Sequence, residues 1–227
     1  MKVLALLLIA AACAHHPNAV EITSSDSTEA EISAQQELLR KAQTENVQVL
    51  APTSFAGAQD FLAKAQDDVK DKDSKKEIYE DLGVSKAYLN EANGLAVARA
   101  PQLQEVLTAR EEALKAGAQG DSLRKTDTDF MVFTASKDSL KNMSSKDKSA
   151  LQNSYLNLEL VTIKGSKLGE VKKTLDEANA KGAARLIPNA FKDAQSKYRS
   201  AEKAVEADRH SDSRTRPVIA AAAASAM

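Results

Sequence analysis

Two segments that lie 136 residues apart in the chain match one another without a gap. Pro52 to Val69 aligns with Pro188 to Val205, and the two share a proline, a phenylalanine, an Ala-Gln pair, an alanine and a valine. In both, the apolar residues advance by alternating steps of three and four: Phe55, Ala58, Leu62, Ala65 and Val69 in the first, and Phe191, Ala194, Tyr198, Ala201 and Val205 in the second. This spacing predicts an apolar seam along an α-helix that begins at its proline.

The composition also favours helices. Charged residues make up 28% of the chain and aromatic residues 4%, and tryptophan is absent. Such a mixture suits long helices with narrow apolar seams better than a core of large side chains. We therefore expect an all-α protein of elongated antiparallel helical hairpins, forming a bundle or a coiled-coil-like rod. The formal net charge of -1 gives no basic excess to attract nucleic acid, so no nucleic-acid partner is expected.

The segment from Lys75 to Ala116 predicts the long helix that returns from the first hairpin. It keeps the alternation of three and four residues through Ile78, Leu82, Ser85, Leu89, Ala92, Ala96, Arg99, Leu103, Val106, Arg110 and Ala113. Pro101 cannot donate a helical hydrogen bond, so we expect a kink near Ala100. Gly117 and Gly120 are expected to end this helix.

A weaker middle copy follows. Asp127 and Asp129 lie near its start, and its seam carries Phe130, Phe133 and Leu140. Ser144 with Asp147 resembles a capping box, which predicts that a second return helix begins there and continues to Lys181-Gly182. The seam of this helix would carry Leu151, Tyr155, Leu158, Val161, Leu168, Val171, Leu175 and Ala178.

These helices divide the body, residues 28–227, into a lead-in helix and hairpins at about 49–118, 119–182 and 183–227. Pro217 is expected to open the third return arm, which would be incomplete. Either the chain is a shortened relative of a longer protein or its C-terminus frays. In both cases Phe191 should be less completely covered than Phe55.

The chain begins with one lysine and a short apolar run, Met1 to Ala12, which ends at the only cysteine, Cys13. This arrangement predicts a secretion signal, and the run is too short to span a bilayer. Ile9 to Cys13 resembles a bacterial lipobox, which implies a signal peptide over residues 1–12 and a lipid on Cys13. Residues 13–27 would then be the lipidated cysteine and a flexible tether. In lipoproteins of this kind, an aspartate directly after the lipidated cysteine favours retention in the inner membrane. Here that position is Ala14, so we expect the protein on the periplasmic face of the outer membrane. The alternative is an ordinary secretion signal.

No metal site, cofactor or catalytic constellation is expected. His15 and His16 lie beside Cys13, but a lipidated cysteine has no thiolate and two adjacent histidines are poor zinc ligands. His210 is interpreted as a solvated loop residue. The sequence holds no glycine-rich phosphate loop, no His-x-x-x-His pair and no Gly-x-Ser-x-Gly elbow, so the chain is not expected to be an enzyme.

Two phrases, Ala109 to Ala118 and Ala178 to Pro188, resemble an alanine-rich helical domain of unknown function. That domain is found in bacterial envelope lipoproteins, often ahead of an OmpA-like domain, and the resemblance covers roughly residues 49–205. No OmpA-like peptidoglycan-binding motif is present, so peptidoglycan binding is not supported.

The resemblance implies a lipid-anchored periplasmic protein of the cell envelope, with the outer membrane as its partner through Cys13. Its helical body would act as a structural spacer or as a module that binds an envelope protein. Two alternatives remain open: a chaperone-like or adaptor lipoprotein that grips partner helices, and a truncated relative of an OmpA-like peptidoglycan-associated lipoprotein.

Overall fold

The computed structural model describes residues 16–23, 27–136 and 138–227, and every regular element within them is helical. The prediction of an all-α protein is confirmed. The elements in chain order are α1 (Thr28–Thr44), α2 (Val47–Leu50), α3 (Pro52–Asp71), α4 (Lys75–Arg99), the 3₁₀ turn η1 (Ala100–Leu103), α5 (Gln104–Lys115), α6 (Gly120–Thr134), the 3₁₀ turn η2 (Ser139–Asn142), α7 (Ser145–Ala180), α8 (Ala183–Leu186), α9 (Pro188–Ala207) and α10 (Asp212–Ala226).

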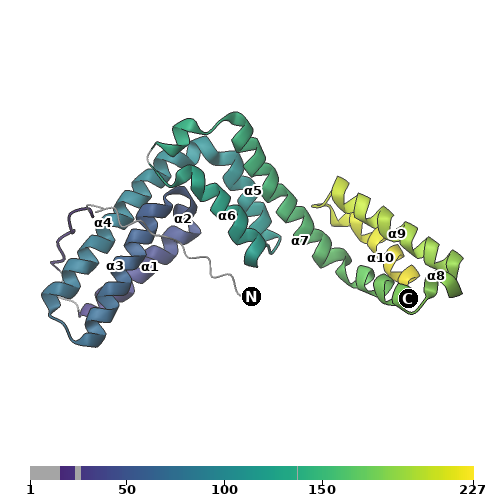
Figure 1. The fold of residues 1–227 in the computed structure, drawn as a ribbon, viewed down its shortest axis with the longest axis horizontal. Coiled ribbons are helices and arrows are strands. Elements are labelled where there is room, and N and C mark those ends of the chain that lie inside the picture. The colour runs from purple at the N-terminus through teal and green to yellow at the C-terminus, as the bar shows by residue number, and fades with distance from the viewer. Residues whose placement is uncertain (1–15, 24–26, 137) are drawn as a thin grey trace, which may run out of the picture. The chain divides into compact units, whose positions relative to one another are not determined.

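The helices form two compact units. Within the described residues, the first unit holds 16–23, 27–101, 131–136 and 138–141, and the second holds 102–130 and 142–227. In the first unit α3 and α4 make a hairpin, and α1 packs against both of them (Figure 1). Their shared core is built from Ile32, Leu39, Phe55, Leu62, Leu82 and Leu89.

A short chain of hydrogen bonds crosses the core of the first unit. The Gln35 side-chain amide of α1 donates to Ser85 Oγ of α4 at 3.0 Å, and Ser85 Oγ donates to the carbonyl of Ala58 in α3 at 2.7 Å. Because buried polar groups are costly unless they are paired, these bonds favour one register of the three helices over its neighbours.

In the second unit the long helix α7 joins two packing partners. It packs against α5 and, further along the chain, against α9 and α10. Phe130 and Tyr155 meet edge to face in the first of these cores, with ring centroids 6.4 Å apart. The second core contains Leu168, Val171, Leu175, Phe191, Ala194, Ala201, Val205 and Ala222.

The repeat extends well beyond the two matched segments. With the same offset of 136 residues, α2 corresponds to α8 and α3 to α9, residue for residue at both ends. The backbone agrees as well. Ala51 before α3 has φ -144° and ψ 58°, and Ile187 before α9 has φ -137° and ψ 58°. We call residues 28–99 the first copy and residues 164–226, which begin inside α7, the second copy; after the shift of 136, α10 begins one residue later than α4.

The expected seam of the first return helix is confirmed over its whole length. All eleven positions named from Ile78 to Ala113 are buried, including the polar Ser85, Arg99 and Arg110. The expected break at Ala100 is also present, because the chain passes from α4 through η1 into α5 there. The capping box at Ser144 is formed, with Ser144 and Asp147 each accepting a hydrogen bond from the other's backbone amide.

Three details of the predicted helices are wrong. Gly120, with φ +72°, begins α6 instead of ending the previous helix, which places Asp127 in the middle of α6. Val161 is exposed, and Glu159 occupies the buried face of α7 instead. Pro217 lies inside α10, which begins five residues earlier at Asp212, where a first-turn carboxylate suits the positive end of the helix dipole.

The earlier start of α10 changes the environment of Phe191. The side chain is 7% exposed, against 4% for Phe55, so both are buried. Ala222 and Thr215 of α10 are also completely covered. The second copy is therefore packed around its phenylalanine nearly as well as the first.

Candidate functional site

The first residues that the structure describes lie against the α3–α4 hairpin. The backbone amide of Val20 donates to the carbonyl of Gly83 at 3.0 Å. A Cβ atom on Gly83 would lie 2.5 Å from the carbonyl oxygen of Val20, so only glycine permits this approach. The segment expected to be a tether thus contacts the body at Val20, four residues after the first described position, His16.

Aromatic rings hold the start of this segment. The His16 ring lies 5.6 Å from the ring of Phe61 in α3, and Phe61 stacks on Tyr88 of α4 at 5.8 Å. The Lys64 ammonium lies 5.9 Å from the centre of the Phe61 ring, within the range of a cation–π contact. The segment is therefore anchored at His16 and at Val20, on two neighbouring helices.

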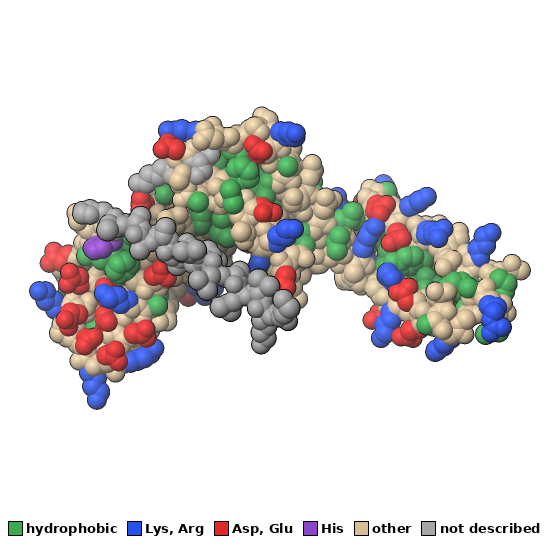
Figure 2. Space-filling view, in the orientation of Figure 1, with side chains coloured by type: hydrophobic (Ala, Val, Ile, Leu, Met, Phe, Trp, Pro, Cys, Tyr) green, Lys and Arg blue, Asp and Glu red, His purple; other side chains and the backbone are tan. Residues whose placement is uncertain are grey.

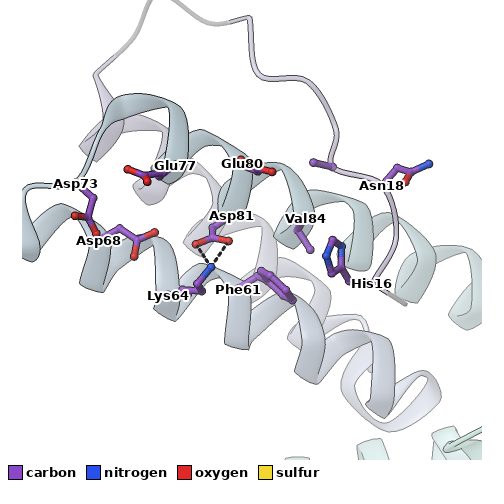
Figure 3. Close-up of a pocket in the computed structure, with 11 residues that line it drawn as sticks. His16, Asn18, Phe61, Lys64, Asp68, Asp73, Glu77, Glu80, Asp81 and Val84 are labelled. Carbon is purple, nitrogen blue, oxygen red and sulfur yellow. Dashed lines mark hydrogen bonds and ion pairs between the residues drawn. The ribbon is translucent and has the colours of Figure 1, made fainter. Parts of the chain in front are cut away.

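Beside this segment the α3–α4 hairpin carries a cavity of about 570 Å³ (Figure 3). Five carboxylates line it: Asp68, Asp73, Glu77, Glu80 and Asp81. Lys64 lies among them, and its ammonium pairs with both oxygens of Asp81, at 2.9 and 2.8 Å. Figure 2 shows acidic side chains gathered over this hairpin. The cavity is negative overall, so it favours a cation over an anion.

The carboxylates of this cavity differ in their electrostatic state. Burial and a hydrogen bond with Asp81 raise the pKa of Asp68 above its ordinary value of 3.8. The hydrogen bond to Asp81 raises the pKa of the Lys64 ammonium. Glu77 behaves in the opposite way, because the hydroxyl and backbone amide of Ser74 lower its pKa. Glu77 is thus committed to capping α4, and Asp81 to Lys64.

A buried arginine closes the other end of the first unit. Arg99, at the end of α4, donates to the carbonyls of Leu50 at 2.6 Å, Thr134 at 2.8 Å and Ser136 at 2.6 Å. The Thr134 hydroxyl donates to the carbonyl of Val49 at 2.6 Å. Together they satisfy the last carbonyls of the short helix α2 and cover it, a role that the seam position of Arg99 did not reveal.

A second buried polar cluster joins α5, α6 and α7. Arg110 donates to both oxygens of Asp127, at 2.9 and 2.8 Å, and the Tyr155 hydroxyl donates to Asp127 Oδ1 at 2.7 Å. Burial, followed by the hydrogen bond to Asp127, raises the pKa of Tyr155. Every charged group here has its partner, so the cluster fixes the three helices in place.

The residues singled out in the sequence fall in different places. Cys13 and His15 lie outside the described residues, and His16 packs on Phe61 beside the acidic cavity. His210 lies in the loop between α9 and α10, and its side chain is 63% exposed, in line with the interpretation of a solvated loop residue; its Nε2 also lies 3.2 Å from Glu159 Oε1. Sequence reasoning missed Glu159, because the apolar Leu158 next to it was the simpler choice for the seam.

No protein family, no curated protein and no solved structure matches this chain. Among the described helices, none combines the length and the apolar character needed to cross a membrane.

Proposed function

We propose that the chain is a lipid-anchored lipoprotein on the periplasmic face of the outer membrane, and that its helical body binds a protein of the cell envelope. The observation that carries the anchor is the position of the only cysteine, Cys13, at the end of an apolar leader. The body would serve as a spacer as well if its hairpins extend as a rod. The proposed role is binding, with no catalytic step.

The docking of the N-terminal segment adds to this proposal. Residues 13–16 span at most about 10 Å when fully extended. Since His16 already lies against Phe61, a lipid on Cys13 would hold the α3–α4 hairpin close to the membrane surface. The acidic cavity on that hairpin would then face the space next to the lipid headgroups.

An exposed apolar patch favours binding over a purely mechanical spacer. Leu186 and Ile187 of the second copy are 63% and 56% exposed, whereas the equivalent Leu50 and Ala51 of the first copy are 2% and 1% exposed. Large apolar side chains left in water next to one another are typical of contact sites. The seams themselves are buried against neighbouring helices, which supports self-packing over the alternative of a chaperone-like grip on partner helices.

Lipid attachment is tested by labelling cells with a radioactive fatty acid. The parent chain should carry the label, and Cys13→Ser should carry none and accumulate as a slower-migrating precursor. Fractionation of the envelope then tests the location, with the label expected in the outer membrane. Label on the Cys13→Ser chain would overturn the proposed anchor.

Partner binding is tested with a photo-reactive amino acid placed at Ile187 in the living cell. The matched control is the same amino acid at Leu38, an exposed apolar position in the first copy. We expect a discrete crosslinked product from position 187 and none from position 38. Equal crosslinked products from the two positions, or none from either, would argue for a spacer. In a separate experiment, co-sedimentation of the mature protein with peptidoglycan would favour the alternative of a truncated OmpA-like peptidoglycan-associated lipoprotein.

A further inference from the structure

Glu159 of α7 is a buried carboxylate at which three separate elements meet. Its side chain is 2% exposed. One oxygen, Oε2, lies 3.2 Å from the guanidinium of Arg209, and the other, Oε1, lies 3.2 Å from Nε2 of His210. Glu112 of α5 completes the group, and the ligand atoms of Glu112, Glu159 and His210 all lie within 4.8 Å of one another. Among the described residues, no other group of His, Cys, Asp and Glu has this arrangement.

The distances suit a metal centre. Zinc bonds to imidazole nitrogen and to carboxylate oxygen at about 2.0 to 2.2 Å, and in a tetrahedral site this separates two neighbouring ligand atoms by about 3.3 Å. The 3.2 Å between His210 Nε2 and Glu159 Oε1 matches that separation. Glu112 pairs with the exposed Lys115 at 3.3 Å. By giving up this surface ion pair, Glu112 can supply the third ligand, and water can supply the fourth.

Arg209 does not occupy the same position as the metal would. It contacts Oε2 of Glu159 and also donates to the carbonyl of Leu156 at 2.8 Å, whereas His210 lies next to the other oxygen, Oε1. A metal-ligating carboxylate commonly receives such a hydrogen bond on its other oxygen, which fixes its orientation. Arg209 would therefore act as an outer partner of the site.

The loop that carries His210 departs from its counterpart in the first copy. There, Ser74 occupies the place of His210, and it caps α4 through the capping box with Glu77. In the second copy, Ser211 precedes α10 and its side chain makes no capping hydrogen bond. This loop is instead held by contacts to α7, through Arg209, His210 and the pair of Lys167 with Asp212 at 2.7 Å.

We propose that Glu112, Glu159 and His210 bind a divalent transition-metal cation of the zinc type, which fastens the α9–α10 loop to α5 and α7. Imidazole and carboxylate ligands together suit zinc and its neighbours better than magnesium or calcium, which prefer oxygen ligands alone. The site is structural, and it adds a function to the second unit that is independent of the lipid anchor and of the exposed patch.

The test is calorimetric titration of zinc chloride into the full chain carrying Cys13→Ser, which removes the only thiol. We expect binding of one zinc ion, weakened at least about tenfold by His210→Ala. His16→Ala is the matched control, because it also removes one of the three histidines, and it should leave the affinity unchanged. The proposal would be overturned if the Cys13→Ser chain did not bind zinc, or if His16→Ala lost zinc binding and His210→Ala kept it.

Two further measurements separate ligand loss from a folding defect. Cobalt(II) in a tetrahedral site gives visible absorption bands, which should appear with the parent chain and vanish in Glu159→Gln and in His210→Ala. Zinc should also raise the thermal unfolding temperature of the parent chain and leave that of His210→Ala unchanged, because a ligand stabilises the state that binds it. If zinc raises both temperatures equally, it binds elsewhere and the site is refuted.

Discussion

The first and second copies follow the same backbone path but bury it to different extents. In both, a four-residue helix leads through one non-helical residue into a helix that begins at proline, with identical bounds after the shift of 136. In the first copy the short helix is covered by Arg99 and Thr134, whereas in the second Leu186 at the end of the short helix and Ile187 after it are exposed. The local sequence thus determines the path, and residues far along the chain determine what is buried.

The largest expected effect tests whether both copies are packed around their phenylalanines. Phe55→Ala and Phe191→Ala should each lower the free energy of unfolding by about 3 to 5 kcal/mol, because both side chains are buried. Chemical denaturation followed by far-ultraviolet circular dichroism measures this. A clearly smaller loss for Phe191→Ala would show that α10 covers Phe191 less firmly in solution than in the structure.

The equivalent leucines test the difference in cover directly. Leu50→Ala should cost about 2 to 5 kcal/mol, since the side chain is buried, with only 2% exposed. Leu186→Ala should change the free energy of unfolding by less than about 0.5 kcal/mol, as is usual for an exposed position. Equal losses would mean that a second molecule of the chain buries Leu186 in solution. The free energy of unfolding would then depend on protein concentration.

The sequence predicted much of this architecture for a physical reason. Helix periodicity and capping are local, so the eleven buried positions from Ile78 to Ala113 and the cap at Ser144 follow from spacing alone. The candidate sites are not local. Arg99 and Glu159 owe their roles to partners 35 to 51 residues away, and no pattern along one helix specifies those partners.

A smaller effect tests the docking of the N-terminal segment, which the first copy carries on α4. Gly94→Ala is the control, because no atom lies near its Cβ position and alanine should stabilise the helix by about 0.5 to 1 kcal/mol. Gly83→Ala should lose that gain, since the new Cβ would collide with the carbonyl of Val20. Hydrogen exchange at the Val20 amide should accelerate in Gly83→Ala only. Unchanged protection would contradict the docked position of the segment.

The smallest effect is a dependence on pH that belongs to the first copy alone. The second copy carries Ala204 at the place of Asp68 and Pro217 at the place of Asp81, so it has no equivalent acidic pair. The folded-state pKa of Asp68 is raised, mainly by burial and then by Asp81. The folded protein therefore binds this proton more tightly than the unfolded chain, and stability is lost as the pH rises through the folded pKa.

Substitution of Asp68 and substitution of Glu77 should change the denaturation midpoint at neutral pH in opposite directions. Asp68→Asn should raise the denaturation midpoint relative to the parent at neutral pH, and the difference should vanish when the pH falls below the ordinary pKa of 3.8. For Glu77 the folded pKa is lowered by Ser74, so its stabilisation is present above the ordinary value of 4.5 and is lost as the pH falls through the folded pKa. Glu77→Gln should therefore lower the midpoint at neutral pH and have little effect in acid. If both variants shifted in the same direction with pH, the two carboxylates would not have the separate roles that Asp81 and Ser74 give them.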